Sequence, residues 1–111
     1  MESILQSIKK LIGITEDYTA FDLDIIIHIN SVFMILNQIG VGPVEGFSIS
    51  DDSAVWSDYL PEDSKNLEAV KTYIYLKVKM VFDPPLSSAV MEATKQMISE
   101  LEWRLNVETE K

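Results

Sequence analysis

Apolar residues recur every three or four positions along most of this chain, the spacing that places them on one face of an α-helix. Glycine, proline or a short polar run interrupts this spacing at several points and divides the chain into segments. The segments predict five helices, over residues 3–12, 21–39, 53–59, 64–82 and 88–106. We therefore expect an all-α fold, a small bundle of about four to five helices.

The predicted helix over residues 21–39 is apolar over most of its circumference. Its polar residues form one narrow strip that consists of Asp24, His28, Ser31 and Gln38. A helix of this composition is usually buried on several sides, so we expect it to be the central helix of the bundle. Thr19 stands three residues before Asp22, which predicts a capping box in which each side chain accepts a hydrogen bond from a backbone amide at the helix start.

The triplet Asp83-Pro84-Pro85 separates the last two predicted helices. Proline has no amide hydrogen and disfavours the helical conformation in the residue before it, so a helix cannot continue through this triplet. Residues 64–82 and 88–106 are therefore expected to form a long C-terminal helical hairpin. The last helix is expected to turn one face inward, formed by Val90, Thr94, Met97, Ile98, Leu101 and Leu105.

The segment Gly40 to Ser50 is the one long stretch without helical spacing, because three glycines and a proline interrupt it. We expect an extended glycine-rich loop. Four apolar side chains stand where loops usually carry polar ones: Val41, Val44, Phe47 and Ile49. They are expected to contact a neighbouring subunit or a partner, in which case serine at Phe47 and Ile49 blocks assembly without unfolding the chain. The alternative is that the loop folds back onto its own core.

Composition indicates a soluble globular chain. Its 111 residues are enough for one domain, residues 1–111, and 47% of them are hydrophobic. No run approaches the roughly 18 uncharged apolar residues that a membrane span requires, so we expect no membrane contact. The chain has no cysteine, which excludes disulfides and thiolate metal sites, and it shows no leader pattern. We expect it to reside in the cytosol or in a particle assembled there.

The formal net charge of −9 bears on possible partners. Affinity for nucleic acid comes largely from cationic side chains that contact phosphates, and this chain has 18 acidic residues against nine basic ones. A tight nucleic-acid-binding protein is therefore disfavoured. If the protein meets duplex DNA, we expect it to do so without holding the duplex.

Catalytic and metal-binding patterns are weak. His28, the only histidine, has Asp24 four residues before it, but no nucleophile motif, phosphate-binding loop or second histidine accompanies the pair. The acid pairs Asp51-Asp52 and Glu100/Glu102 lack the spacing of known metal-ligand motifs. We expect no enzyme activity, no cofactor and no metal. His28 is interpreted as a polar surface or subunit-contact residue.

Lys71, Tyr75 and Lys79 fall on one stripe of the predicted helix over residues 64–82. Aromatic residues between lysines can contact phosphate or the acidic groups of a partner. The alternative is a solvated face whose lysine stems cover apolar neighbours. The sequence leaves both interpretations open.

Several segments together resemble the head-tail connector, or adaptor, proteins of tailed bacteriophages. The resemblance covers essentially the whole chain and is most specific in its last third. It rests on the short first helix, the helix over residues 21–39, Ile39-Gly-Val-Gly-Pro43, Gly46-Phe47, Trp56, Tyr73-Ile-Tyr-Leu-Lys-Val-Lys-Met-Val-Phe-Asp-Pro-Pro85 and Glu100-Leu-Glu-Trp-Arg-Leu-Asn106.

This resemblance implies a structural virion protein at the head-tail interface. Such proteins form a ring, commonly twelvefold, beneath the portal and extend the channel for double-stranded DNA toward the stopper or tail-completion protein. The resemblance places portal docking in the C-terminal segment, at Asn106, Val107 and Glu108 and onward to Lys111. It also places the Gly40 to Ser50 loop at the channel or at a neighbouring subunit.

Two other classes fit an acidic helical chain of this size: a DNA mimic that occupies a nucleic-acid-binding host protein, and a small dimeric regulator. Mimics usually display carboxylates in long rows, whereas lysines stand among the acids here. Residues 107–111 are expected to form a flexible tail, since Val107 is the one apolar residue in this segment.

Overall fold

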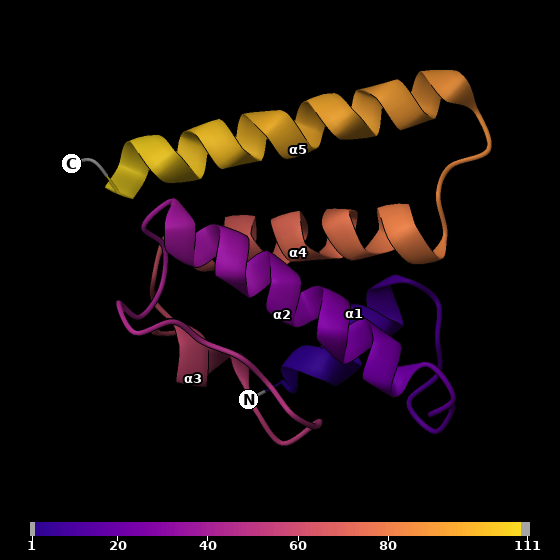
Figure 1. Cartoon of the computed structure of the whole chain (residues 1–111), viewed down its shortest axis with the longest axis horizontal. Helices are drawn as coiled ribbons and strands as arrows, with labels where there is room; N and C mark the ends of the chain where they lie inside the picture. Colours follow the sequence, from indigo (N-terminus) through magenta and orange to yellow (C-terminus); the bar gives the residue numbers. More distant parts are fainter. Residues whose placement is uncertain (1, 110–111) are drawn as a thin grey trace.

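The computed structural model describes residues 2–109 and contains five α-helices (Figure 1). They are α1 (Ile4–Leu11), α2 (Asp22–Gln38), α3 (Trp56–Tyr59), α4 (Leu67–Phe82) and α5 (Ser88–Thr109). Over these residues the structure has no β-strand, and Ser3 and Val55 form an isolated bridge. The all-α class predicted from the sequence is confirmed.

Helix boundaries differ from the prediction at three places. α3 is shorter than residues 53–59, because Asp51 accepts hydrogen bonds from the backbone and hydroxyl of Ser53 and holds that residue in a turn. α4 begins at Leu67 rather than residue 64, since residues 61–66 form successive turns. α5 continues to Thr109, three residues beyond the predicted end.

The helices pack in a crossed arrangement around α4. In Figure 1, α2 crosses in front of α4, and α5 runs antiparallel along α4 on the other side. α1 contacts both α2 and α4. The predicted C-terminal hairpin of α4 and α5 is therefore present. Tyr73 of α4 donates a hydrogen bond to Glu102 of α5, and burial together with this bond raises the pKa of Tyr73 above its ordinary value.

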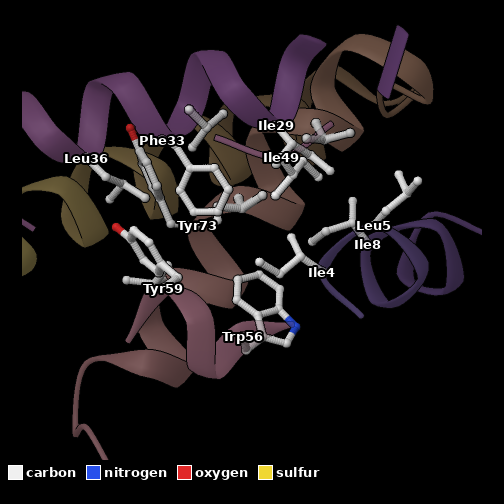
Figure 2. Packing of buried hydrophobic residues seen from close by; sticks show 14 of the residues in the cluster. Ile4, Leu5, Ile8, Ile29, Phe33, Leu36, Ile49, Trp56, Tyr59 and Tyr73 are labelled. Carbon is white, nitrogen blue, oxygen red and sulfur yellow. The ribbon is translucent and has the colours of Figure 1, made fainter. Parts of the chain in front are cut away.

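The core lies between α1, α2, α3 and α4 (Figure 2). Phe33 of α2 packs against Tyr59 of α3 with ring centroids 4.6 Å apart. Trp56 is completely buried, and its indole N–H donates to the hydroxyl of Ser7 over 2.9 Å. A buried indole usually needs such a partner, so this bond fixes α3 against α1.

The predicted capping box at the start of α2 is wrong. No side chain caps this helix, and the Asp22 carboxylate instead forms an ion pair with Lys9 of α1 over 2.8 Å. Lys9 is completely buried, and its ammonium also donates to the carbonyl oxygens of Glu16 and Tyr18. One lysine thus fixes the connection between α1 and α2.

The expectation that α2 is buried on several sides is also wrong. Its buried face lies against the core, but three large apolar side chains on the other face are exposed: Leu23 by 70%, Ile27 by 54% and Met34 by 58%. In the described part of the chain, α1, α3 and α4 all pack on the buried face of α2, and these three side chains stay more than half exposed. We call these three residues the α2 ridge.

The first half of α5 contacts the bundle loosely. Of the inner-face residues predicted for this helix, Leu105 is buried, whereas Val90 and Met97 are about half exposed. The two prolines separate α4 from α5, and three apolar residues of α5 that pack in or against the core, Ile98, Leu101 and Leu105, lie from the middle of the helix onward. Val81 near the end of α4 is left exposed as a result.

Candidate functional site

The Gly40 to Ser50 loop packs largely on its own core, which is the alternative that the sequence left open. Val41 and Ile49 are 4% and 5% exposed, and Phe47 is partly buried with its ring 5.0 Å from that of Phe33. The expectation that these three side chains are exposed and free to contact a neighbouring subunit or a partner is therefore wrong. The side-chain amide of Asn30 on α2 both donates to and accepts from the backbone of Ile49, and this holds the loop against the helix.

Val44 is the exception in this loop. It is 96% exposed, and Glu45 beside it is exposed as well. The two residues occupy the centre of a turn that the amide of Gly46 closes by donating to the carbonyl of Pro43 over 3.0 Å. We call Val44 and Glu45 the loop tip.

The loop tip is held in place from two sides. The side-chain amide of Asn37 on α2 donates to the carbonyls of Pro43 and Val44 over 3.0 and 3.3 Å. Gly42 has φ +88°, and a Cβ there would lie 2.6 Å from the ring of Tyr59. Since only glycine fits this close approach, the ring sets the path of the chain into the turn. The tip is thus presented by a braced backbone.

Sequence reasoning missed the two asparagines that anchor this loop. Asn30 and Asn37 are seven residues apart and therefore share one face of α2. Two asparagines at that spacing on a strongly apolar helix could have predicted this anchoring. A buried polar side chain is usually hydrogen-bonded, most often to backbone groups. The structure shows that this backbone belongs to the loop.

A groove opens between α4 and α5 on one side of the hairpin. Its volume is about 470 Å³, and it is lined by Lys77, Met80, Val81, Lys95, Ile98, Ser99 and Glu102. Neither lysine forms an ion pair with any acidic group of the described chain. Glu102 accepts the hydrogen bond from Tyr73. We call this feature the hairpin groove. Its apolar residues are Met80, Val81 and Ile98, and Lys77 and Lys95 are available to an acidic partner.

The predicted stripe of Lys71, Tyr75 and Lys79 is divided in the structure. Lys71 lies 5.5 Å above the ring of Trp56 and 3.7 Å from Glu68. Lys79 pairs with Asp83 over 2.9 Å, and the hydrogen bond to that carboxylate raises the pKa of Lys79. Lys71 and Tyr75, but not Lys79, line a cleft of about 760 Å³ between α1 and α4. Both lysines are already engaged by acids of their own chain, as on a solvated face.

The residues predicted to dock a portal lie in the last turns of α5. Asn106, Val107 and Glu108 are partly buried, and Glu108 pairs with Lys65 over 3.0 Å. Residues 107–109 are helical here, while Glu110 and Lys111 of the predicted flexible tail lie outside the described residues. Whether this segment is flexible in solution or binds a portal stays a prediction.

His28 packs against an aromatic ring rather than within a catalytic group. Its imidazole meets Phe82 edge-on with ring centroids 5.4 Å apart. Across residues 2–109, no three histidine, aspartate or glutamate side chains gather closely enough to hold a metal ion. In the same part of the chain, no helix is long and apolar enough to cross a membrane. His28 thus links α2 to the end of α4.

The acidic charge is concentrated in one part of the chain. Residues 11–64 contain ten acidic residues and no lysine or arginine, whereas residues 65–111 contain seven of each sign. The first part forms α2, the loop and α3, and the second forms the α4–α5 hairpin. The excess of acidic residues therefore lies in the part of the chain before the hairpin, and the hairpin carries equal numbers of acidic and basic residues.

Comparison with known protein families finds a match over nearly the whole chain. A family model described as phage connector protein matches residues 4–111. No curated protein and no solved structure matches the chain. The match spans every helix described above, including the loop tip and the hairpin groove.

Proposed function

The chain belongs to the phage connector protein family, and from this premise we propose that it is the structural subunit of a ring that joins phage head to tail. The ring, commonly twelvefold in proteins of the kind that it resembles, would lie beneath the portal and extend the DNA channel. The observation that carries the proposal is the family match over residues 4–111.

Exposed apolar surface supports an assembling role. The α2 ridge, Val44 of the loop tip and Val81 of the hairpin groove are all exposed in the single chain. A contiguous group of large exposed apolar side chains, such as the α2 ridge, is typical of an interaction site. Contacts between unlike faces of neighbouring subunits close into a ring where the rotation from one subunit to the next divides a full turn.

The proposed partners lie above and below the ring in the virion. The portal protein would contact the end of α5, at Asn106, Val107 and Glu108 and onward to Lys111, and a stopper or tail-completion protein would follow on the opposite side. Assembly would take place in the host cytoplasm. No enzymatic step is proposed, since joining head to tail requires contact surfaces rather than catalysis.

Double-stranded DNA would pass through the ring without being held. The net charge of −9 and the absence of any lysine or arginine over residues 11–64 disfavour contacts with phosphate. An acidic lining repels the duplex and lets it slide. A tight, sequence-specific complex with duplex DNA at about 150 mM salt would instead favour a regulatory protein.

Light scattering tests the assembly. We expect the purified protein, mixed with the portal protein of the same phage, to form a closed ring of fixed mass on the portal. The protein alone serves as the comparison and shows whether the ring also forms without the portal. A chain that remains monomeric or dimeric in the presence of the portal contradicts the proposed function.

Deletion of residues 107–111 tests the docking segment. We expect the melting temperature to change little, because the ion pair lost with Glu108 lies at the surface, where such pairs contribute roughly 0–1 kcal/mol. Attachment to the portal, measured by co-sedimentation, should weaken strongly. A truncated protein that binds the portal as well as the full chain would show that docking occurs elsewhere.

A further inference from the structure

We propose that the loop tip of one subunit inserts into the hairpin groove of a second copy of this chain, and that this contact links successive subunits. The inference rests on the proposed ring and names the two surfaces that would build it. Val44 and Glu45 form the inserted part, and Lys77, Val81 and Lys95 are the main receiving residues.

The loop tip is built for insertion. Its turn is closed by the bond between Gly46 and Pro43 and is braced by the amide of Asn37. A preorganised segment loses little conformational freedom on binding, so more of its contact energy contributes to affinity. Val44 is 96% exposed on this braced turn, so its side chain is available for contact with another chain.

The two surfaces match in chemistry. The valine side chain fits the apolar floor formed by Met80, Val81 and Ile98. Beside it, the Glu45 carboxylate meets two lysines that form no ion pair within residues 2–109 and one carboxylate, Glu102, which accepts the hydrogen bond from Tyr73, so positive charge exceeds negative charge in the groove. Such opposite charges favour the correct pairing and register of two subunits.

The loop and the groove lie at different ends of the molecule. Figure 1 shows the loop after α2 at one end of the long axis and the connection from α4 to α5 at the other. The groove is lined by the last turns of α4, near that connection. A tip therefore reaches the groove of another copy rather than its own. Each copy then binds one neighbour through its tip and another through its groove, and such a head-to-tail arrangement closes into a ring where the rotation between neighbours divides a full turn.

Charge reversal tests the contact under the conditions in which the wild type forms rings. Glu45→Lys is expected to raise the concentration needed for half-assembly about tenfold or more, because it faces two lysines with a third positive charge. The double change Lys77→Glu with Lys95→Glu should impair assembly as well. Combining all three substitutions in one chain should restore rings. Glu62→Lys, which reverses an exposed acid outside the Gly40 to Ser50 loop, serves as the matched control and should assemble normally.

Mixing two defective variants gives a second test. Val44→Asp disables the tip and leaves the groove intact, whereas Lys77→Glu with Lys95→Glu does the reverse. An equimolar mixture should form one-to-one pairs that grow no further, detected by light scattering, because only one of the two possible contacts is intact. Circular dichroism of each variant should match the wild type, since the altered side chains lie outside the core.

The outcomes separate this inference from the proposed function. Rings that form normally with Val44→Asp and Glu45→Lys overturn the inference and leave the ring intact. Loss of rings with Glu45→Lys that the groove reversal does not restore shows that the tip contacts another surface or another protein, which overturns the groove assignment. A wild-type chain that forms no ring with its portal contradicts the proposed function itself.

Discussion

Replacing Lys9 with alanine is expected to lower the free energy of unfolding by about 3 kcal/mol. The Lys9 side chain is completely buried and holds Asp22 and two backbone carbonyls, those of Glu16 and Tyr18. Removing one partner of a buried ion pair costs roughly 3–5 kcal/mol because the remaining charge loses its compensation. Asp22 retains 24% exposure, which places the expected loss at the lower end of that range.

Urea denaturation followed by helical circular dichroism measures this loss, and the midpoint of thermal unfolding should fall by about 10 °C or more. Lys10→Ala is the matched control, because it makes the same substitution at the next position of α1, where the side chain is exposed. We expect the control to lie within about 0.5 kcal/mol of the wild type. Equal effects of the two substitutions would show that the Lys9 contacts do not hold the connection between α1 and α2.

The fold class and the hairpin were predictable because local signals determine them. Two consecutive prolines after Asp83 stop a helix whatever the rest of the chain does, and Gly13 and Gly40 follow the ends of the first two helices closely. The helical spacing of apolar residues then predicts most helix boundaries to within a few residues of those in the structure. These features depend only on neighbours along the chain.

The role of Lys9 was not predictable in the same way. A lysine within an amphipathic helix normally lies on the solvated side, and nothing near it in the sequence marks it as buried. Its burial depends on the path of residues 12–21, which brings two carbonyls and the Asp22 carboxylate over the end of α1. Only the packed structure brings these groups together.

The α2 ridge shows a second limit of sequence patterns. Apolar residues over most of the circumference of α2 predicted burial on several sides, yet Leu23, Ile27 and Met34 are exposed in the single chain. A hydrophobic pattern predicts that a side chain is buried. The pattern does not predict whether the covering surface belongs to the same chain or to another chain. In the ring that we propose, a neighbouring subunit would cover this ridge.

Within the loop, Ile49→Ser is expected to lower the free energy of unfolding by about 3–4 kcal/mol. Ile49 is 5% exposed and belongs to the core, so serine removes most of a buried apolar side chain and places a hydroxyl there. The hydrogen bonds from Asn30 go to the backbone and survive the change, so the loss reports the side chain alone. Chemical denaturation measures it.

Val44→Ser in the same loop is the matched comparison, and it should leave stability within about 0.5 kcal/mol of the wild type because Val44 is 96% exposed. The two substitutions are chemically alike and five residues apart, so a difference between them comes from burial. Ile49→Ser should reduce assembly only by unfolding the subunit, whereas Val44→Ser should weaken assembly of a folded one. An Ile49→Ser protein with wild-type stability would contradict this assignment, because it would mean that Ile49 faces a partner, as the sequence alone had indicated, and not the core.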